Sequence, residues 1–397
     1  MNPLIAASLI TETGYKTFNI PESLMPAGPG IAEASAKIEA AGQMVGTFPE
    51  RLMELAGRSC YDSLGQGRPS GEYHQHIQEV GHLSVCEHAN MTFNIELPTA
   101  SSMNDMLALL GSLINRKGMT VRPHMMPGMP GGYGAVINLN MRTLLEWDSW
   151  TNSNRMALVG VPGAGQFTEH LGECLRFLGH SEAPQVITSA VTPEAGPFSL
   201  SRTHYDDPDF LWISMFLSGS RGFSHEMVRH GDDTAISQRS TRFVDESGAE
   251  WVLHPLIDQF MAEAEAETND FEMLEAINTQ LGAKKAYDCI VGHLQPWLIA
   301  RGLDKFTARK QSRGAARGFL GNALYTEMVF SASVAQWRRI FKQRVHPAAD
   351  AEIRELGAKA LTQIKELSKY RENFDDMLLI PSPDGIGEVL DLESVTA

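Results

Sequence analysis

The order of strand-like and helix-like segments is what most constrains the fold of this chain. Short apolar runs typical of strands, such as residues 90–97 and 325–331, are separated by helical segments of very different lengths. A doubly wound parallel sheet needs a regular alternation of strand and helix, which this order lacks. The sequence therefore predicts an α+β fold, in which long helices flank a central, mostly antiparallel sheet.

Composition narrows the class of protein. The chain has 397 residues, 43% of them hydrophobic, which is enough to fill a substantial core. Its formal net charge of −15 argues against general binding to nucleic acids or anionic membranes, because both need a basic face. The four scattered cysteines fit reduced thiols better than a disulfide framework, and no apolar run reaches membrane-spanning length. We expect a soluble, cytoplasmic protein.

The segment richest in chemical groups runs from Phe216 to Glu246. An apolar strand leads into a short helix that ends near Arg229-His230, and a polar loop containing Ser240 and Arg242 follows. Arginine forks match phosphate oxygens in two-pronged contacts, and hydroxyl and N–H groups complete such a cradle. A local basic pocket in an acidic chain favours a small anionic ligand. The alternative is a charged helix end with a solvated loop.

These residues resemble the RHR-x7-8-S signature of flavin-dependent thymidylate synthases, with Gly231 in place of the third residue, usually arginine. The segment GHLSVCEHANMTFNIELP, residues 81–98, resembles the G-H-x-S-x-x-E-H-x-x-x-T-F element of the same family. Two later segments, FTARKQSRGAARGF and WRRIFKQRVHPAADAEIREL, are similar to the family's A-R-x-x-L-P-N element and its helix pair. The resemblance covers about residues 50–98 and 211–370, in family order.

The resemblance implies an enzyme that methylates C5 of a uridine nucleotide, dUMP above all, to give thymidylate. FAD, NADPH as reductant and methylenetetrahydrofolate as carbon donor are the implied cofactors, and a homotetramer with sites between subunits is the implied assembly. The implied catalytic residues are Arg344, His230 and Ser240. The implied nucleotide contacts are Glu226, Gln238, Ser240, Arg242, Arg317 and Arg344. The implied flavin contacts are His82, Ser84, Arg229 and His230.

A long insertion separates the two halves of the resemblance. We expect a synthase-like part at residues 1–98, an insertion at 99–209 and the signature and helical part at 210–397. The insertion should hold helices at 101–113 and up to residue 177, a loop at 122–134 and a Gly-rich turn at 160–165. That turn fits neither a phosphate loop nor a dinucleotide fingerprint.

The family's Asn-x-Arg pair, which faces the flavin, is replaced by Ser333-Val334-Ala335. Asn140-Met141-Arg142 in the insertion stands in the same strand-to-helix context, either by chance or as part of a partial repeat of the fold's C-terminal element. The repeat hypothesis predicts that Asn140 and Arg142 point into a cleft formed by His82, Ser84, Arg229 and His230.

Several alternatives stay open at this level. His82 and His88 are also compatible with ordinary capping residues, and a zinc site from His74, His76, His82 and His88 has no supporting thiolate cluster, so we expect no metal. The insertion and Gly231 leave open C5-hydroxymethylation of a pyrimidine nucleotide, or UMP as the substrate. An inactive nucleotide-binding relative with a structural or regulatory role is a further alternative.

Overall fold

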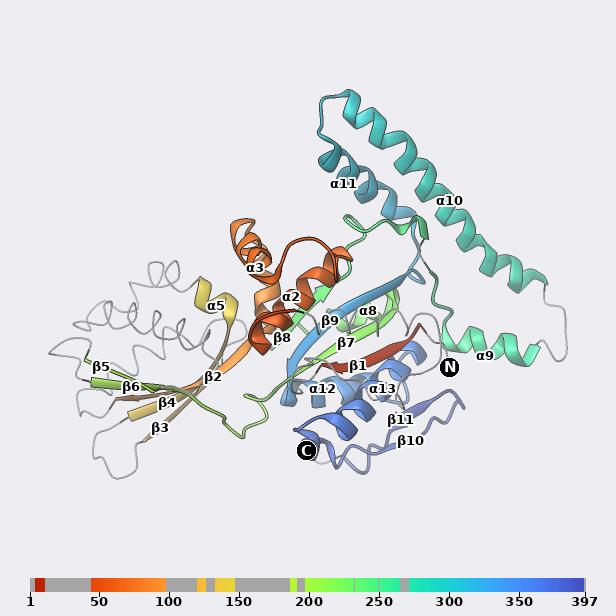
Figure 1. Cartoon of the computed structure of the whole chain (residues 1–397). Coiled ribbons are helices and arrows are strands. Elements are labelled where there is room, and N and C mark those ends of the chain that lie inside the picture. The colour runs from red at the N-terminus through yellow and green to blue at the C-terminus, as the bar shows by residue number, and fades with distance from the viewer. Residues whose placement is uncertain are drawn as a thin grey trace, which may run out of the picture.

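Two antiparallel sheets form the framework of the computed structural model (Figure 1). The structure describes residues 4–10, 44–97, 120–125, 133–146, 186–190, 197–231, 233–248, 250–264 and 271–395. The first sheet has the order β1-β7-β9-β8, with bounds Ala6–Ile10, Trp212–Ser220, Tyr325–Ser333 and Thr234–Gln238. The second sheet has the order β3-β4-β2-β6-β5, with bounds Thr120–Met125, Tyr133–Asn140, Asn90–Leu97, Pro197–Arg202 and Val186–Ala190. The α+β prediction with antiparallel sheets is confirmed.

Strand β9 lies in the middle of the first sheet and is buried along its whole length. One face of this sheet, with Phe216 and Val329, packs on the core beneath α2 (Phe48–Tyr61) and the short turn η2 (Leu83–His88). The other face, with Met215 and Phe330, packs on α12 (Val334–Arg344) and α13 (Ala351–Leu367). Because successive strand residues point to opposite faces, an apolar run such as YTEMVFSAS can serve both cores.

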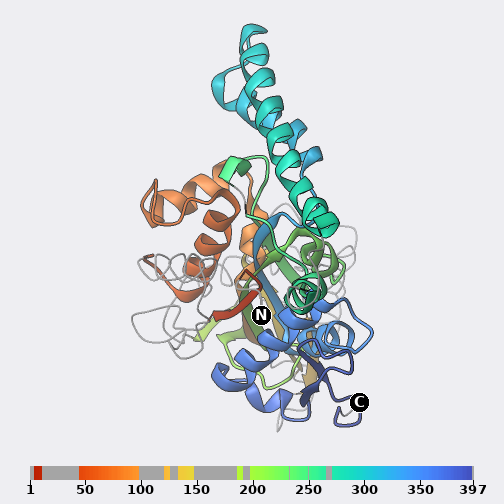
Figure 2. The ribbon, with the colours of Figure 1, turned by 90° about the vertical axis from the view of Figure 1, so that its right-hand side faces the viewer.

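The remaining described elements surround these two cores. They are α3 (Ser70–Glu79), α5 (Met141–Leu145), α8 (Arg221–Met227), η4 (Glu246–Gly248), α9 (Pro255–Ala264), α10 (Phe271–Ala300), α11 (Lys305–Ala316), η5 (Arg317–Phe319), η6 (Arg371–Phe374), β10 (Leu379–Pro381) and β11 (Glu388–Leu390). Helices α10 and α11 form a hairpin that projects away from the sheets (Figures 1 and 2). No helix in the described ranges is long and apolar enough to span a membrane.

In each sheet one strand runs directly into a helix, and the two strand-to-helix junctions pair with their neighbouring strands in the same way. In the first sheet Trp212 pairs with Ser333, and the N–H of Val334 donates to the carbonyl of Leu211 at 2.7 Å. In the second sheet Asn90 pairs with Asn140, and the N–H of Met141 donates to the carbonyl of Ala89 at 2.9 Å.

The helix that follows each strand is also capped alike. Ser333 Oγ accepts from the N–H of Gln336 at 3.1 Å, and Asn140 Oδ1 accepts from the N–H of Thr143 at 2.9 Å. Asn140 therefore corresponds to Ser333 and Arg142 to Ala335.

Two strands lie where the sequence predicts loops. Strand β8 occupies part of the expected polar loop, because small residues such as Ala235 and Ser237 fit against the buried β9. Strand β3 occupies the start of the expected loop at 122–134, and it tolerates Pro123 because it is an edge strand of the second sheet. The helices expected at 101–113 and up to 177, and the turn at 160–165, lie outside the described residues.

Candidate functional site

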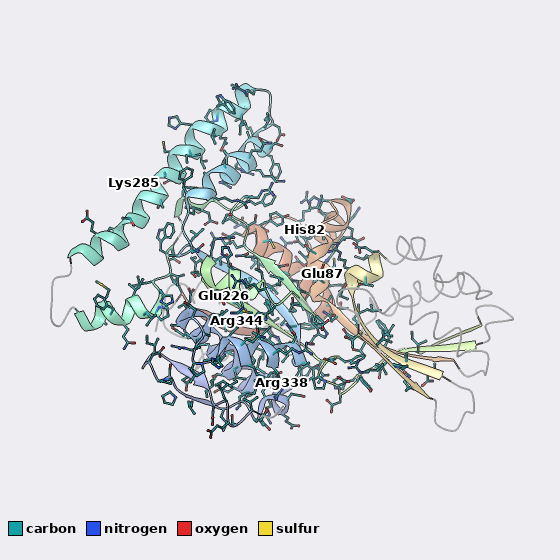
Figure 3. The ribbon with its side chains drawn as sticks, turned by 180° about the vertical axis from the view of Figure 1, so that it is seen from behind. His82, Glu87, Glu226, Lys285, Arg338 and Arg344 are labelled. Carbon is teal, nitrogen blue, oxygen red and sulfur yellow. The ribbon has the colours of Figure 1, made fainter. Side chains whose placement is uncertain are left out.

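Arg344, at the end of α12, joins two residues of the signature segment. Its Nε donates to His230 Nε2 at 2.9 Å, one Nη contacts the carboxylate of Glu226, and the other donates to the Glu226 carbonyl at 3.3 Å. Figure 3 shows Glu226 and Arg344 side by side in front of the first sheet. The group forms because α8 and α12 cover the same face of that sheet.

The contact with Arg344 fixes the protonation state of His230. A guanidinium only donates hydrogen bonds, so Nε2 must accept and the ring proton must lie on Nδ1. Burial lowers the pKa of His230 and the charge of Arg344 lowers it further, while Glu226 opposes both. The site therefore contains a neutral imidazole beside a cation that a carboxylate balances.

Gln238 belongs to the same side of the sheet. Its Nε2 donates to Ser224 Oγ at 2.8 Å and to Thr326 Oγ1 at 3.2 Å, which ties β8 to α8 and β9. Sequence reasoning did not single out Arg221, which begins α8 and is half-buried. Burial lowers its pKa, Glu246 raises it, and the charge of Arg317 lowers it again. The sequence signal that could have identified Arg221 is its position inside the SRGFSHEMV segment, which precedes the signature.

The arginines expected to bind phosphate lie beside α11. Arg242 is exposed and runs along this helix, so that a Cβ added to Gly314 would lie 4.0 Å from its Cγ and Nε. Arg317 is exposed in η5 at the end of the same helix. Arg313 has a structural role instead, since it binds the Phe243 carbonyl at 2.6 Å and Asp245 at 2.5 Å. The backbone N–H of Ser240 donates to the Cys60 carbonyl at 2.9 Å, which joins this loop to α2.

The residues expected to face the flavin divide into two groups. His82 contacts the Tyr61 hydroxyl through Nδ1 at 3.3 Å, and burial lowers its pKa. Ser84 follows in η2 and is partly exposed, and Arg142 reaches the same turn through Glu87, with Nη1 2.6 Å from the carboxylate. Figure 3 shows His82 and Glu87 close together, apart from the Glu226–Arg344 pair.

The rest of the expected flavin residues have other surroundings. Arg229 is exposed beside His230, on the signature segment. Arg142 also binds Glu146 at 3.0 Å, so two carboxylates share its charge. Asn140 is buried and its Oδ1 is used to cap α5. The single cleft that would unite these side chains with His230 remains a prediction.

His88 is a buried histidine with both ring nitrogens occupied. Nδ1 lies 2.8 Å from Ser331 Oγ and Nε2 lies 3.0 Å from Ser237 Oγ. Burial lowers the pKa of His88 to about 3, so the ring is neutral. Because hydroxyls occupy both nitrogens, His88 cannot serve as the zinc ligand that the histidine spacing left open.

Comparison with known proteins gives consistent matches. The sequence model described as "thymidylate synthase complementing protein" matches residues 44–104 and 211–368, which include every candidate site residue except Asn140 and Arg142. The flavin-dependent thymidylate synthase of Mycolicibacterium gilvum is 30% identical over 184 residues, which is 46% of this chain and 68% of that protein. The same enzyme of Mycobacterium marinum is 33% identical over 165 residues, 41% of this chain and 60% of that protein, so this alignment spans less than two thirds of its length.

A solved structure is also similar in part. The crystal structure of thymidylate synthase X from Helicobacter pylori with FAD and dUMP is 17% identical, with a TM-score of 0.28, over 42% of this chain and 72% of that chain.

Proposed function

Because the chain belongs to the thymidylate synthase complementing protein family, whose curated relatives are flavin-dependent thymidylate synthases, we propose that it methylates C5 of a uridine nucleotide reductively. The acceptor is dUMP, the carbon donor methylenetetrahydrofolate and the reductant NADPH, and the product is thymidylate. The observation that carries this proposal is the group of Arg344, Glu226 and His230, in which the end of α12 contacts two residues of the signature segment.

Arg344 is the residue that polarises the pyrimidine ring. C5 of a uracil is a weak nucleophile, and a cation at a ring carbonyl stabilises the negative charge that develops as C5 attacks. Glu226 and His230 hold the guanidinium in one orientation, so little reorganisation is needed during the reaction. Gln238 and Glu226 make the remaining contacts to the pyrimidine and the sugar.

Arg242 and Arg317 bind the nucleotide phosphate, with the hydroxyl of Ser240 completing the cradle. Both arginines are exposed next to one end of α11, so neither pays a large desolvation cost to keep its charge. The net acidity of the chain makes such a local basic patch selective for a small anion.

FAD is the cofactor, and His82, Ser84, Arg229, His230, Asn140 and Arg142 are the residues that would hold it. A side chain has room at the signature, since a Cβ added to Gly231 would meet only the Val228 carbonyl, at 4.0 Å. When bound and reduced, FAD supplies the hydride. Arg142 stays charged between Glu87 and Glu146 and orients the turn that carries Ser84.

The insertion at 99–209, between parts 1–98 and 210–397, is a partial repeat of the C-terminal element. Two observations support this: β4 lies between β2 and β3 as β9 lies between β7 and β8, and both middle strands end in the same capped junction. By this correspondence Arg142 supplies the cation that Ala335 lacks.

A homotetramer is the proposed assembly. The α10–α11 hairpin and η5 expose large apolar side chains, which are Trp297, Ile299, Phe306 and Phe319. A projecting hairpin with such residues is typical of a surface buried in an oligomer. This hairpin also leads to Arg317, so assembly and the phosphate site are linked.

One observation favours a second candidate, a nucleotide-binding relative without catalysis. Arginine is missing at Gly231 and Ala335, and the charge of Arg142 is already shared by two carboxylates. In this case the Arg344 group would bind a nucleotide, and flavin would bind too weakly to support turnover.

The deciding experiment begins with the absorbance spectrum of the purified protein, before and after incubation with FAD. The flavin-loaded protein is then assayed with dUMP, UMP and dCMP in the presence of methylenetetrahydrofolate and NADPH, and products are identified by mass. A product 14 mass units above dUMP supports the proposal, since a methyl group replaces a hydrogen. A hydroxymethylated nucleotide would show that the product differs from thymidylate, and methylated UMP would show that the substrate differs from dUMP. Nucleotide binding without any flavin uptake would refute the proposed enzymatic activity and support the nucleotide-binding relative without catalysis.

A further inference from the structure

Helix α11 carries positive charge along one side. Residues 305–326 contain five lysines and arginines and no aspartate or glutamate, in a chain whose net charge is −15. The buried residues of α11 are small, which are Ala308, Ser312 and Ala316. The other side of the helix carries, at the three- and four-residue spacing of a single helix face, Phe306, Lys310, Arg313 and Arg317. We call these four residues, together with the neighbouring Arg309, the cationic face of α11.

Two cations of this face have aromatic rings rather than carboxylates as neighbours. Lys310 Nζ lies 5.0 Å from the centroid of the Phe243 ring, and the Arg309 guanidinium lies 5.8 Å from that of Phe306. Arg313 differs, because it binds Asp245 at 2.5 Å. Among the residues that the structure describes, Lys310 and Arg309 make no ion pair. Their charges can therefore bind an anion that comes from outside the described chain.

A row of aromatic rings joins the cationic face to the turn that carries the expected flavin contacts. The ring centroids of His82 and Tyr61 are 5.6 Å apart, and those of Tyr61 and Phe243 are 4.8 Å apart. Phe243 and Phe306 follow at 6.2 Å. Tyr61 and Phe243 are half-buried, whereas Phe306 is 55% exposed. The row thus begins at His82 and ends, on the surface, at the two cations named above.

This arrangement matches a long ligand with aromatic rings at one end and negative charges at the other. The carbon donor of the proposed reaction has this form, since its pterin is followed by an aminobenzoyl ring and then by glutamate. Each further γ-linked glutamate adds one carboxylate. Phe306 and Arg317 are eleven residues apart, which is about 16 Å along a helix, so the face has room for several carboxylates. The nucleotide has one compact phosphate, which Arg242 and Arg317 bind in the proposed function.

We propose that the cationic face of α11 binds the tail of the folate donor, and that the donor is preferred in its poly-γ-glutamate form. The aminobenzoyl ring packs on the exposed Phe306, and the tail carboxylates contact Lys310 and Arg309. The inference rests on the proposed function, in which methylenetetrahydrofolate is the donor. A short anionic chain is favoured over a nucleic acid, because Asp245 and the exposed Asp304 border the face and the chain as a whole is acidic.

The test is calorimetric titration of the full chain, incubated with FAD, with pteroylmonoglutamate and pteroylpentaglutamate. We expect the pentaglutamate to bind about 5- to 50-fold more tightly, and this advantage to shrink as sodium chloride is added. The double variant Arg309→Ala and Lys310→Ala should lose most of the advantage and keep its affinity for the monoglutamate. Lys285→Ala is the matched control, an exposed lysine on α10 that Figure 3 shows away from His82, and it should keep the full advantage.

A second pair of ligands separates this inference from the proposed methylation. Aminobenzoylpentaglutamate and aminobenzoylmonoglutamate carry the ring and the tail without the pterin, so their binding depends on neither flavin nor turnover. Tighter binding of the pentaglutamate form supports the tail site even if no thymidylate is formed. Thymidylate formation with equal KM values for the two forms of the donor would overturn the tail site and leave the proposed reaction standing.

Three further results would overturn the inference. The first is equal affinity for pteroylmonoglutamate and pteroylpentaglutamate in the natural protein. The second is an advantage of the pentaglutamate that persists in the double variant, since the tail would then bind elsewhere. The third is displacement of the pentaglutamate by an equal concentration of single-stranded oligothymidylate, which would identify a nucleic-acid surface. If the double variant does not fold, Lys310→Gln and the charge-preserving Lys310→Arg decide, because only the first should reduce the advantage.

Discussion

The neutral, buried His88 should make the stability of this protein strongly dependent on pH. Burial lowers the pKa of its ring from the ordinary 6.5 to about 3 in the folded chain. The unfolded chain therefore takes up this proton first as the pH falls below 6.5. Stability contributed by the neutral ring is present above pH 6.5 and is lost progressively between pH 6.5 and about 3.

The size of the effect follows from the shift. Each pH unit below 6.5 costs about 1.4 kcal/mol for one such group, so lowering the pH from 7 to 5 removes about 2 kcal/mol. Ser331 and Ser237 can accept from a charged ring, so the hydrogen bonds survive protonation and the cost is the desolvation of the charge.

The assay is urea unfolding at pH 7 and pH 5 for the natural protein and for His88→Asn. Replacing the ring lowers stability at both pH values, but only the natural protein should lose the additional 2 kcal/mol or so. Other histidines with lowered pKa values, such as His82 and His230, are present in both proteins and cancel in the comparison. Equal losses in the two proteins would refute the account of a neutral, buried His88.

Three further predictions concern the candidate site. Arg344→Ala should lower kcat/KM about 10²–10³-fold, measured by thymidylate formation, because a cation that stabilises the transition state is lost. The matched control is Arg339→Ala, exposed on the same helix, and comparable loss there would contradict the role of Arg344. Gly231→Arg should tighten FAD binding about 10- to 100-fold, measured by flavin fluorescence, since the position has room for a side chain. Arg242→Ala and Arg317→Ala should raise KM for dUMP with little change in kcat, and a fall in kcat alone would count against phosphate binding.

The fold class was predictable because it depends on local patterns. The alternation in residues 90–97 and the apolar run at 325–331 report burial directly, and both are strands in the structure. Strand β8 was missed because its residues, TAISQ, are small and polar, and they are buried only through pairing with β9. Such a strand depends on its neighbour, which no local pattern reports.

The candidate site residues remain a prediction, which the family resemblance supplied rather than any local pattern. The contact of Arg344 with His230 joins residues 114 positions apart, and only the family resemblance pointed to both of them. The ion pair of Arg142 with Glu87 was not predicted, since long-range charge pairing leaves no spacing signal. The pair with Glu146 has the i,i+4 spacing of a helix, so the sequence did contain a signal for it. A cavity of about 420 Å³ was also missed, because its walls come from six separate segments, which are residues 9–10, 48–52, 88–92, 138, 203–214 and 368–370.

The position of β1 in the first sheet has a consequence for synthesis of the chain on the ribosome. Residues 6–10 pair with β7, and Lys359 Nζ on α13 binds the Ile5 carbonyl at 2.6 Å. At about 5–20 residues per second, β1 waits roughly 10–40 s for the about 200 residues that precede β7, and longer for α13. The second sheet needs only residues 90–202 and can form earlier. The first sheet closes only when nearly the whole chain has emerged, so a prematurely ended chain keeps the second sheet but lacks the group around Arg344.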